Sequence, residues 1–232
     1  MTLEVNNLVA GYGDIAILDK VSFRIADGQI LAFFGHNGAG KSTTLKAVLG
    51  LIPAREGEII LDGERIGGLS ITDRLRRGLR IMPEGRGVFP DLSVEDNIEV
   101  VARQVCPRTG SKISVSDVYD LLPVLKDRRK TIVGEMSGGQ QQMLAFGLVL
   151  LGSPKCFLLE EPSVGLQPDL VEALFAKMSE ICRSLAISAI LVEHRIASAL
   201  LISDHVIIIK SGRIVFNDSA EVARRTDFWP YF

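Results

Sequence analysis

A glycine-rich segment at residues 35–43, GHNGAGKST, constrains this chain more than any other feature. It fits the pattern G-x-x-x-x-G-K-[ST], with Lys41 and Ser42 at the last two positions. Residues 29–34 (QILAFF) precede it and suit a buried strand, whereas Thr44–Gly50 suits a helix that its last glycine closes. This order of strand, glycine loop and helix predicts a phosphate-binding loop and disfavours a chance glycine-rich turn.

The chemistry of such a loop is local. Glycines let several backbone N–H groups point at one anion, and the helix N-terminus adds the positive end of its dipole. Lys41 supplies a point charge for the β and γ phosphates, and the Ser42 hydroxyl is placed to bind Mg²⁺. For His36, a partly exposed side chain without chemistry is the simpler interpretation. The predicted nucleotide-binding residues here are Gly35, His36, Asn37, Gly38, Ala39, Gly40, Lys41, Ser42 and Thr43.

Composition and size narrow the class of protein. The chain has 232 residues, 47% of them hydrophobic and 23% charged, as in an ordinary globular protein of one large domain with or without an insert. The net charge of −2 gives no case for a nucleic-acid partner. Cys106, Cys156 and Cys182 form no C-x-x-C pair, so reduced cytosolic thiols are expected rather than a metal cage.

Targeting signals are not apparent in the sequence. The N-terminus, MTLEVNNLVAGYG, lacks a basic region followed by an apolar stretch, so no signal peptide is expected. No apolar run approaches the ~18 residues that span a bilayer. If the protein works at a membrane, another chain has to supply the span.

Hydrophobic patterning predicts two kinds of strand. Val5–Val9, Leu18–Ile25 and Glu58–Ile66 lie between turn signals and are expected to form an antiparallel sheet beside the glycine loop. Runs that are apolar throughout suit parallel strands covered on both faces; these are Ile30–Phe34, Leu79–Met82, Cys156–Leu159 and Ser188–Val192. His205–Lys210 and Arg213–Phe216, joined by Ser211-Gly212, predict a hairpin.

The core pattern stops between residues 85 and 135. Ser93-x-x-Asp96 has the spacing of a helix start, and Val94–Val101 and Val115–Leu125 are expected to be helices. The charged run 126–130 is expected to be a solvated face. We therefore interpret this segment as a helical insert in an α/β core.

A second glycine motif, MSGGQQQ, begins at Met136. Ser137 and Gln140 have the spacing of a capping box, S-x-x-Q, and the two glycines between them leave the helix N-terminus bare. Such a terminus suits phosphate, although taken alone a plain helix cap is an equally good interpretation.

Two further strands end in polar residues. Glu160 and Glu161 close the apolar run CFLLEE, and acidic residues at this edge of a parallel sheet face the ligand crevice. One could hold Mg²⁺ through water and the next could orient or deprotonate an attacking water; the alternative is a solvated strand end. His194, after the run ILVE, could donate a hydrogen bond to a γ-phosphate, although a lone histidine is more often structural.

Together these motifs, in this order and over essentially the whole chain, resemble the ATP-binding cassette of ABC transporters. MSGGQ is similar to the family signature LSGGQ, with Met for Leu. The resemblance implies an α/β fold with a P-loop NTPase core, a mainly parallel sheet, an antiparallel β subdomain and a helical insert. It implies one domain over residues 1–232, with the core in 1–84 and 136–232 and the helical subdomain in 85–135.

The resemblance also implies roles for individual residues. Tyr12 matches the aromatic residue on which adenine stacks, Glu161 the catalytic glutamate and His194 the switch histidine. Lys41 and Ser42 match the residues that bind phosphate and Mg²⁺. In this family two cassettes pair head to tail, so that the signature of one covers the γ-phosphate held by the other; the corresponding residues here are Ser137, Gly138, Gly139 and Gln140.

Two stretches, IMPEGRGVFP from Ile81 and EPSVGLQP from Glu161, look like the cassettes of importers for branched-chain amino acids, or for urea and short-chain amides. Glu84 lies where most cassettes have a Gln that links the nucleotide to the permease, and it adds charge near Mg²⁺. The implied partners are transmembrane permease subunits, a second cassette that is identical or related, and indirectly a periplasmic or surface solute-binding protein. The implied location is the cytoplasmic face of the membrane.

Three positions depart from the family pattern. Glu160 replaces the usual Asp that serves Mg²⁺, and its oxygens sit about 1.5 Å further out for the same backbone. A misplacement of ~1 Å near the chemistry can cost ~100-fold in rate. Gln167 replaces an Asp, which the resembling subgroup tolerates, and Leu148 replaces an Arg.

Three functions are therefore compared: an ATPase that drives an importer, a cassette that binds ATP with little turnover, and a cassette ATPase acting on DNA or ribosomes. The third function would need a cluster of basic residues for nucleic-acid binding, and the sequence does not show one.

Overall fold

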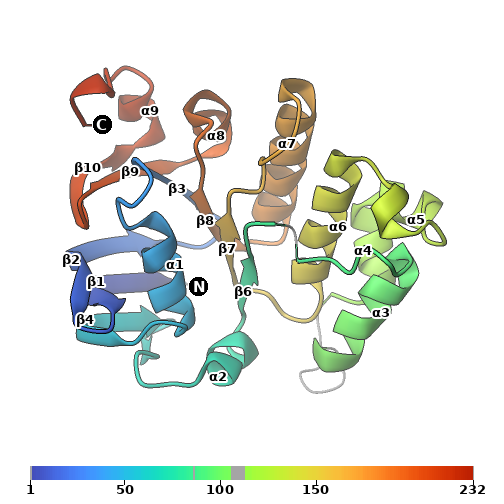
Figure 1. Cartoon of the computed structure of the whole chain (residues 1–232), viewed down its shortest axis with the longest axis horizontal. Helices are drawn as coiled ribbons and strands as arrows, with labels where there is room; N and C mark the ends of the chain where they lie inside the picture. The colour runs from blue at the N-terminus through green and yellow to red at the C-terminus, as the bar shows by residue number, and fades with distance from the viewer. Residues whose placement is uncertain (1, 86, 106–112, 232) are drawn as a thin grey trace.

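The computed structural model describes residues 2–85, 87–105 and 113–231. Cys106 therefore lies outside the described residues, as does Arg86 of the stretch that begins at Ile81. The strands form two sheets, and the fold is the α/β cassette with a P-loop core that the resemblance implies (Figure 1). The strands are β1 (Leu3–Tyr12), β2 (Ile15–Ile25), β3 (Ile30–Phe34), β4 (Ala54–Leu61), β5 (Glu64–Arg65), β6 (Leu79–Met82), β7 (Cys156–Glu160), β8 (Ser188–Val192), β9 (His205–Lys210) and β10 (Arg213–Ser219).

The larger sheet has the order β10-β9-β3-β8-β7-β6, and all its pairs are parallel except β9–β10. Every residue of β3, β7 and β8 is buried, which explains why these strands are apolar throughout. Successive residues of one strand serve different cores, since Leu31 and Phe33 face one hydrophobic cluster and Ala32 and Phe34 the other. The predicted parallel strands and the C-terminal hairpin are confirmed.

The smaller sheet is antiparallel, with the order β2-β1-β4-β5. The prediction of one strand over Glu58–Ile66 is wrong, because the chain turns at Asp62-Gly63 and splits it into β4 and β5. Asp62 and Gly63 both have positive φ angles (52° and 78°), which a continuous strand does not allow. On the outer face, ion pairs such as Arg65–Glu58 (2.7 Å) join neighbouring strands.

The helices cover both faces of the larger sheet. Figure 1 shows α1 between the two sheets, and α6 and α7 on the far side of β7, with α3 to α5 beyond them. The helices are α1 (Lys41–Leu49), α2 (Ile71–Arg76), α3 (Val94–Val105), α4 (Val115–Leu121), α5 (Pro123–Asp127), α6 (Gly138–Leu150), α7 (Pro168–Ser184), α8 (Ile196–Ile202) and α9 (Ala220–Ala223), with short 3-10 turns at Val133–Glu135 and Trp229–Tyr231. None of the described helices is both long and apolar enough to cross a bilayer.

The segment after β6 is helical, with one correction. The expected helix Val115–Leu125 is two helices, α4 and α5, because Leu122 precedes Pro123 and takes a non-helical conformation (φ −129°, ψ 72°). The predicted cap of α3 is confirmed, since the Asp96 amide donates to the Ser93 hydroxyl (3.1 Å). One hydrophobic cluster joins α3, α4 and α5 to α6 and α7.

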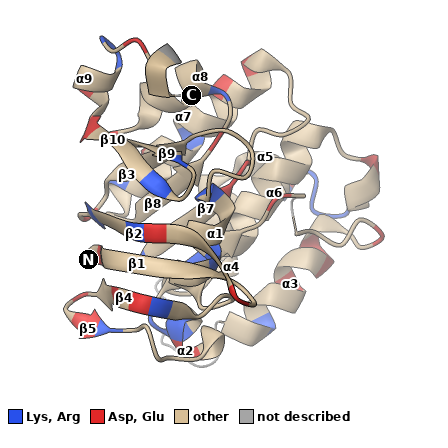
Figure 2. Ribbon diagram, turned by 60° about the vertical axis from the view of Figure 1, so that its left-hand side comes forward, with Lys and Arg blue, Asp and Glu red and all other residues tan. Residues whose placement is uncertain are grey.

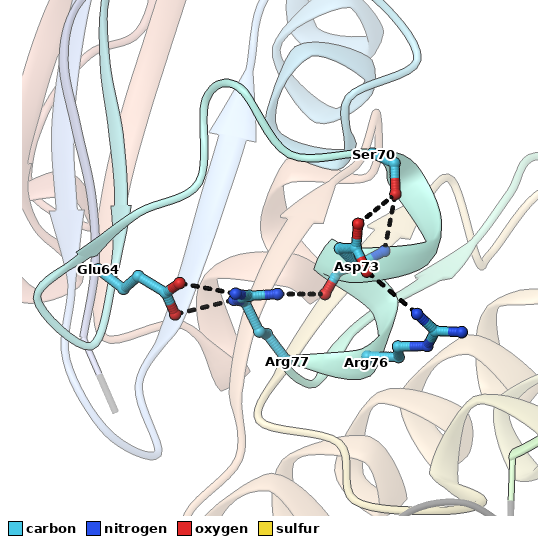
Figure 3. A network of polar contacts seen from close by, with 5 residues as sticks. All are labelled: Glu64, Ser70, Asp73, Arg76 and Arg77. Atoms are coloured by element: carbon cyan, nitrogen blue, oxygen red, sulfur yellow. Dashed lines mark hydrogen bonds and ion pairs between the residues drawn. The ribbon is translucent and has the colours of Figure 1, made fainter.

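Helix α2 is tied to the antiparallel sheet by a polar network (Figure 3). The Ser70 hydroxyl caps the helix by accepting from the Asp73 amide (3.2 Å). Arg77 donates two hydrogen bonds to the carboxylate of Glu64, a residue of β5, at 2.8 and 2.7 Å. Figure 2 shows basic and acidic residues interspersed over the same sheet and helices. Exposed ion pairs of this kind connect neighbouring elements but contribute little to the stability of the fold.

The two sheets meet at Gly212, in the turn between β9 and β10. The Asp19 amide of β2 donates to the Gly212 carbonyl (2.9 Å), and the Gly212 amide donates to the Ala39 carbonyl in the glycine loop (2.8 Å). A Cβ at Gly212 would lie 1.9 Å from the Ile17 carbonyl oxygen, and its φ of 78° also favours glycine. This position therefore joins the C-terminal hairpin, the antiparallel sheet and the glycine loop at one point.

Candidate nucleotide-binding site

The glycine loop connects the buried strand β3 to helix α1. Gly40 precedes the first helical residue with a φ of 116°, and no side chain caps the helix N-terminus. At Gly35 (φ 145°) a Cβ would lie 2.2 Å from the Ile209 carbonyl oxygen, so only glycine fits there. The loop is thus held tightly from behind while the N–H groups at the start of α1 remain available to an anion.

Lys41 is the buried cation of this loop. Its side chain is only 5% exposed, and its Nζ donates to the Gly35 carbonyl (2.7 Å) and the His36 carbonyl (3.0 Å). Burial lowers the pKa of Lys41, and the nearby Glu161 carboxylate opposes that shift. The ammonium group is therefore held by the loop that it serves, at a place where a phosphate could replace carbonyl oxygens as its partner.

A pocket of about 440 Å³ lies over the loop and collects most of the predicted residues. It is lined by Tyr12, Ile17, Asn37, Gly38, Gly40, Lys41, Ser42, Thr43, Glu84, Glu161 and His194. Of the predicted loop residues, Gly35, His36 and Ala39 do not line it. Ile17 was not predicted; its place beside Tyr12 depends on the pairing of β1 with β2.

Glu161 and His194 face each other across this pocket. Their side chains are 2.7 Å apart, from His194 Nε2 to Glu161 Oε1. Glu161 directly follows β7 with a φ of 48°, a conformation that is rare for a residue with a side chain. Its amide donates to the Val192 carbonyl at the end of β8 (2.9 Å), so the two strand ends that carry these residues are joined.

A buried carboxylate that the sequence analysis missed strengthens this joint. Glu193 is only 2% exposed; its Oε1 accepts from the Ser163 amide (2.9 Å) and its Oε2 from the amides of His194 (2.9 Å) and Arg195 (3.3 Å). Arg195 in turn donates to the Leu166 carbonyl (2.6 Å). The loops after β7 and β8 are therefore linked by side chains as well as by the backbone. The sequence signal was an acidic residue at the end of an apolar strand, next to a histidine.

The oxygen groups around the pocket are of the kind that Mg²⁺ prefers. The Ser42 hydroxyl and the carboxylates of Glu84 and Glu161 line the same pocket, and Mg²⁺ commonly takes a few such oxygens, substrate phosphates and water. Within the described residues no group of three or more His, Cys, Asp or Glu side chains forms a ready-made metal cage. Glu160, a predicted Mg²⁺ residue, is 6% exposed at the end of β7 and does not line the pocket.

Comparisons with known proteins agree with this geometry. The profile of the family described as "ABC transporter" matches residues 18–164. The high-affinity branched-chain amino acid transport ATP-binding protein BraG of Pseudomonas aeruginosa is 37% identical over 90% of this chain and 88% of its own length. The probable branched-chain amino acid transport ATP-binding protein LivF of Archaeoglobus fulgidus is 34% identical over 94% of this chain and 92% of its own.

The chain belongs to the ABC transporter family. Solved structures place it in the same fold. An ATP-binding subunit of an ABC transporter matches with a TM-score of 0.79 and 27% identity over 97% of this chain and 92% of that one. A nucleotide-free ATP-binding cassette from an ABC transporter matches with a TM-score of 0.84, over 97% and 94% of the two chains. At 23% identity the second match supports the fold alone.

The signature segment of this ABC cassette lies apart from its own pocket. The predicted capping box is present, since the Gln140 amide donates to the Ser137 hydroxyl (3.3 Å) and the Ser137 amide donates to Gln140 Oε1 (3.1 Å). Ser137 is exposed, and neither it nor Gly138, Gly139 or Gln140 lines the pocket. The N-terminus of α6 therefore carries an exposed serine followed by a half-buried Gly138, whereas Gly139 is buried.

One position that departs from the family pattern and two of the three cysteines are buried in this cassette. Leu148 is 7% exposed inside the cluster that joins α6 to α3–α5. Cys156 and Cys182 are free and buried, and burial raises the pKa of the Cys182 thiol to about 12. A buried thiol with a raised pKa is an inert core residue, and both cysteines are free thiols, as expected from the sequence.

Proposed function

We propose that this chain is the ATP-binding and ATP-hydrolysing subunit that energises an ABC importer for branched-chain amino acids or related small polar solutes. The observation that carries the proposal is the convergence of Lys41, Ser42, Glu161 and His194 on one pocket over a bare helix N-terminus. The names of the two similar transport ATP-binding proteins support the class of solute.

In this proposal the triphosphate lies over the glycine loop. The amides of residues 38–43 and the Lys41 ammonium group hold the β and γ phosphates, and adenine stacks on Tyr12, which is half-exposed at the pocket edge. Ser42, with Glu84 and Glu160 nearby, would hold Mg²⁺, directly or through water. Bound there, the metal would supply positive charge that neutralises the phosphate oxygens.

Glu161 is the proposed catalytic carboxylate. It would accept a hydrogen bond from the attacking water and orient it in line with the γ-phosphate, as such transfers depend mostly on positioning and charge. His194, which contacts Glu161 through Nε2 in this structure, would turn from the carboxylate to donate to the γ-phosphate. The Glu161–His194 contact would then open when the phosphate and water enter between them.

The site is proposed to be completed by a second cassette, identical or related. The Ser137–Gln140 segment, of which Ser137 is exposed, does not line its own pocket, and the amides at the start of α6 would suit the γ-phosphate held by a partner. Residues 85–135 would form the subdomain on which transmembrane permease subunits dock, at the cytoplasmic face of the membrane. A periplasmic or surface solute-binding protein would act only through the permease.

A second candidate, a cassette that binds ATP with little turnover, is motivated by Glu160. This residue replaces the usual Asp, is buried at the end of β7 and does not line the pocket. A longer carboxylate in this place could leave Mg²⁺ without one of its usual water-mediated partners.

The two candidates are separated by measuring Mg²⁺-dependent phosphate release and ATP binding on the same assembled complex with its permease. The proposal expects release well above the rate of a Glu161→Gln complex, with ATP bound in both. Bound ATP with release at the background rate would leave the binding cassette as the function. Absence of ATP binding would overturn both.

A further inference from the structure

The tip of the β1–β2 hairpin carries Tyr12 but has little packing of its own. Tyr12 is 50% exposed and Ile15 is 68% exposed. At Gly13, in the turn between them, an added Cβ would meet no atom within 4 Å. Hydrophobic burial therefore does little to hold this tip against the pocket.

One arginine from the neighbouring strand contacts the whole turn. Arg55, in β4, donates through Nη1 to the Asp14 carbonyl (3.1 Å) and through Nη2 to the carbonyls of Gly13 and Ile15 (2.5 and 3.1 Å). Three successive backbone acceptors thus share one guanidinium, whose planar fork suits several acceptors at once. No other described side chain is seen to donate to these three carbonyls.

The strand ladder determines where Arg55 can reach. Ala10 of β1 pairs with Ala54 of β4 and Val9 pairs with Glu56, so Arg55 lies at the register shift between these two pairs, and its long side chain extends from there to the turn. Within the described part of the chain Arg55 forms no ion pair with a carboxylate, so its donors are directed to the turn. Arg65, on the adjoining strand β5, differs in this respect because it pairs with Glu58 at 2.7 Å.

We propose that Arg55 is a positioning residue for the base of the nucleotide: it holds the hairpin tip so that Tyr12 faces the pocket, and thereby raises the affinity for the adenine end without touching the nucleotide. The proposal rests on the proposed function, in which Tyr12 is the stacking platform. Its physical basis is that a platform ordered before binding loses less conformational entropy when the base stacks.

The inference predicts an effect that is selective for the base. Full-length protein is titrated with ATP and with inorganic tripolyphosphate, which shares the phosphates but has no base. Since stacking on one aromatic residue changes affinity by about tenfold or more, Tyr12→Ala should weaken ATP binding by that factor. Arg55→Ala should weaken ATP binding about three- to tenfold and tripolyphosphate binding less than about twofold.

A double-mutant cycle tests the connection to Tyr12. If Arg55 acts through the tyrosine, Arg55→Ala together with Tyr12→Ala binds ATP no more weakly than Tyr12→Ala alone. Arg65→Ala is the matched control, since it removes an arginine from the same sheet that contacts another side chain and should leave the ATP affinity unchanged. Arg55→Gln is a milder variant that keeps two donors, should Arg55→Ala unfold.

The proposal is overturned if the effects of Arg55 and Tyr12 on ATP binding add, or if Arg55→Ala weakens ATP and tripolyphosphate equally. These results are distinct from failure of the proposed function, which would appear as a parent protein that does not bind ATP at all.

Discussion

The two ends of the pocket rest on differently built sheets. The end proposed to hold the phosphates, here the phosphate end, is made by loops that leave β3, β7 and β8, whose residues are all buried between two hydrophobic clusters. The end proposed to hold the adenine, here the base end, is made by the tip of the β1–β2 hairpin, where Tyr12 and Ile15 are exposed. The phosphate end is thus positioned by the core of the protein, and the base end by a few contacts at a sheet edge.

This difference in construction matches a difference in how precisely each end has to position its groups. Charge stabilisation in phosphoryl transfer requires groups held within a fraction of an ångström, which a packed parallel sheet can supply. Stacking on an aromatic ring tolerates more movement, because every base presents a flat face. We therefore expect substitutions at the phosphate end to have larger effects, and more of them on the rate, than substitutions at the base end.

Glu161→Gln should give the largest effect. The amide keeps the side-chain shape but is a far weaker base, so hydrolysis in the assembled complex should fall ~100- to 10,000-fold while ATP binding persists. Phosphate release and nucleotide retention measure the two parts separately. Hydrolysis at the parental rate would show that another group carries the role of the base.

Lys41→Ala should mainly weaken binding. Removing the buried ammonium group that is proposed to contact two phosphates should raise the dissociation constant for ATP by about 100-fold, or ~2.7 kcal/mol. Equilibrium binding of ATP measures this, and thermal unfolding without nucleotide is the control for folding. An unchanged affinity would contradict the placement of the phosphates over the loop.

Glu193→Gln should have an intermediate effect on the rate of hydrolysis. It tests most directly whether the phosphate end depends on contacts that support its loops. Glutamine has one carbonyl oxygen, so it cannot accept from Ser163 and from His194 and Arg195 as the carboxylate does. We expect about tenfold slower hydrolysis with ATP affinity within about twofold, because the loops that carry Glu161 and His194 lose their common support.

The control for Glu193→Gln is Glu180→Gln, an exposed carboxylate on α7 that pairs with Lys177. Hydrolysis unchanged in both variants would indicate that the backbone link from Glu161 to Val192 is sufficient to position these loops. An equal loss of binding and rate would indicate a general loss of structure rather than of positioning.

Glu160→Asp should have the smallest effect. It restores the shorter carboxylate, and a gain in hydrolysis of about threefold without change in ATP affinity would show that the longer side chain slows this cassette. A fall in hydrolysis would mean that the site is adapted to glutamate. In that case the motive for a cassette with little turnover disappears.

Much of the phosphate end could be predicted from sequence because its signals are local. The residues from Gly35 to Thr43 are consecutive, and the capping box of α6 spans only Ser137 to Gln140, so spacing alone places them. The strand ends at Glu161 and His194 followed from the rule that parallel strands point their carboxyl ends to one edge. The fold and the family were confirmed by the structure and the comparisons.

Long-range contacts set the limit of the prediction. Arg55 meets a turn about 40 residues earlier, and Glu193 meets an amide 30 residues earlier. The sequence next to Arg55 and next to Glu193 does not indicate which distant backbone groups these side chains contact. The two errors in secondary structure were of another kind, since the turn at Asp62-Gly63 and the proline after Leu122 were visible in the sequence but were given less weight than the apolar pattern.

The joint at Gly212 has an evolutionary consequence. A methyl group there would collide with the backbone of β2, and backbone atoms cannot yield as a flexible side chain can. Every other amino acid would therefore be strained at this position, although Gly212 does not line the pocket. We therefore expect this glycine to be conserved among homologous sequences about as strictly as the lysine of the P-loop. Its presence could then help to identify remote homologues.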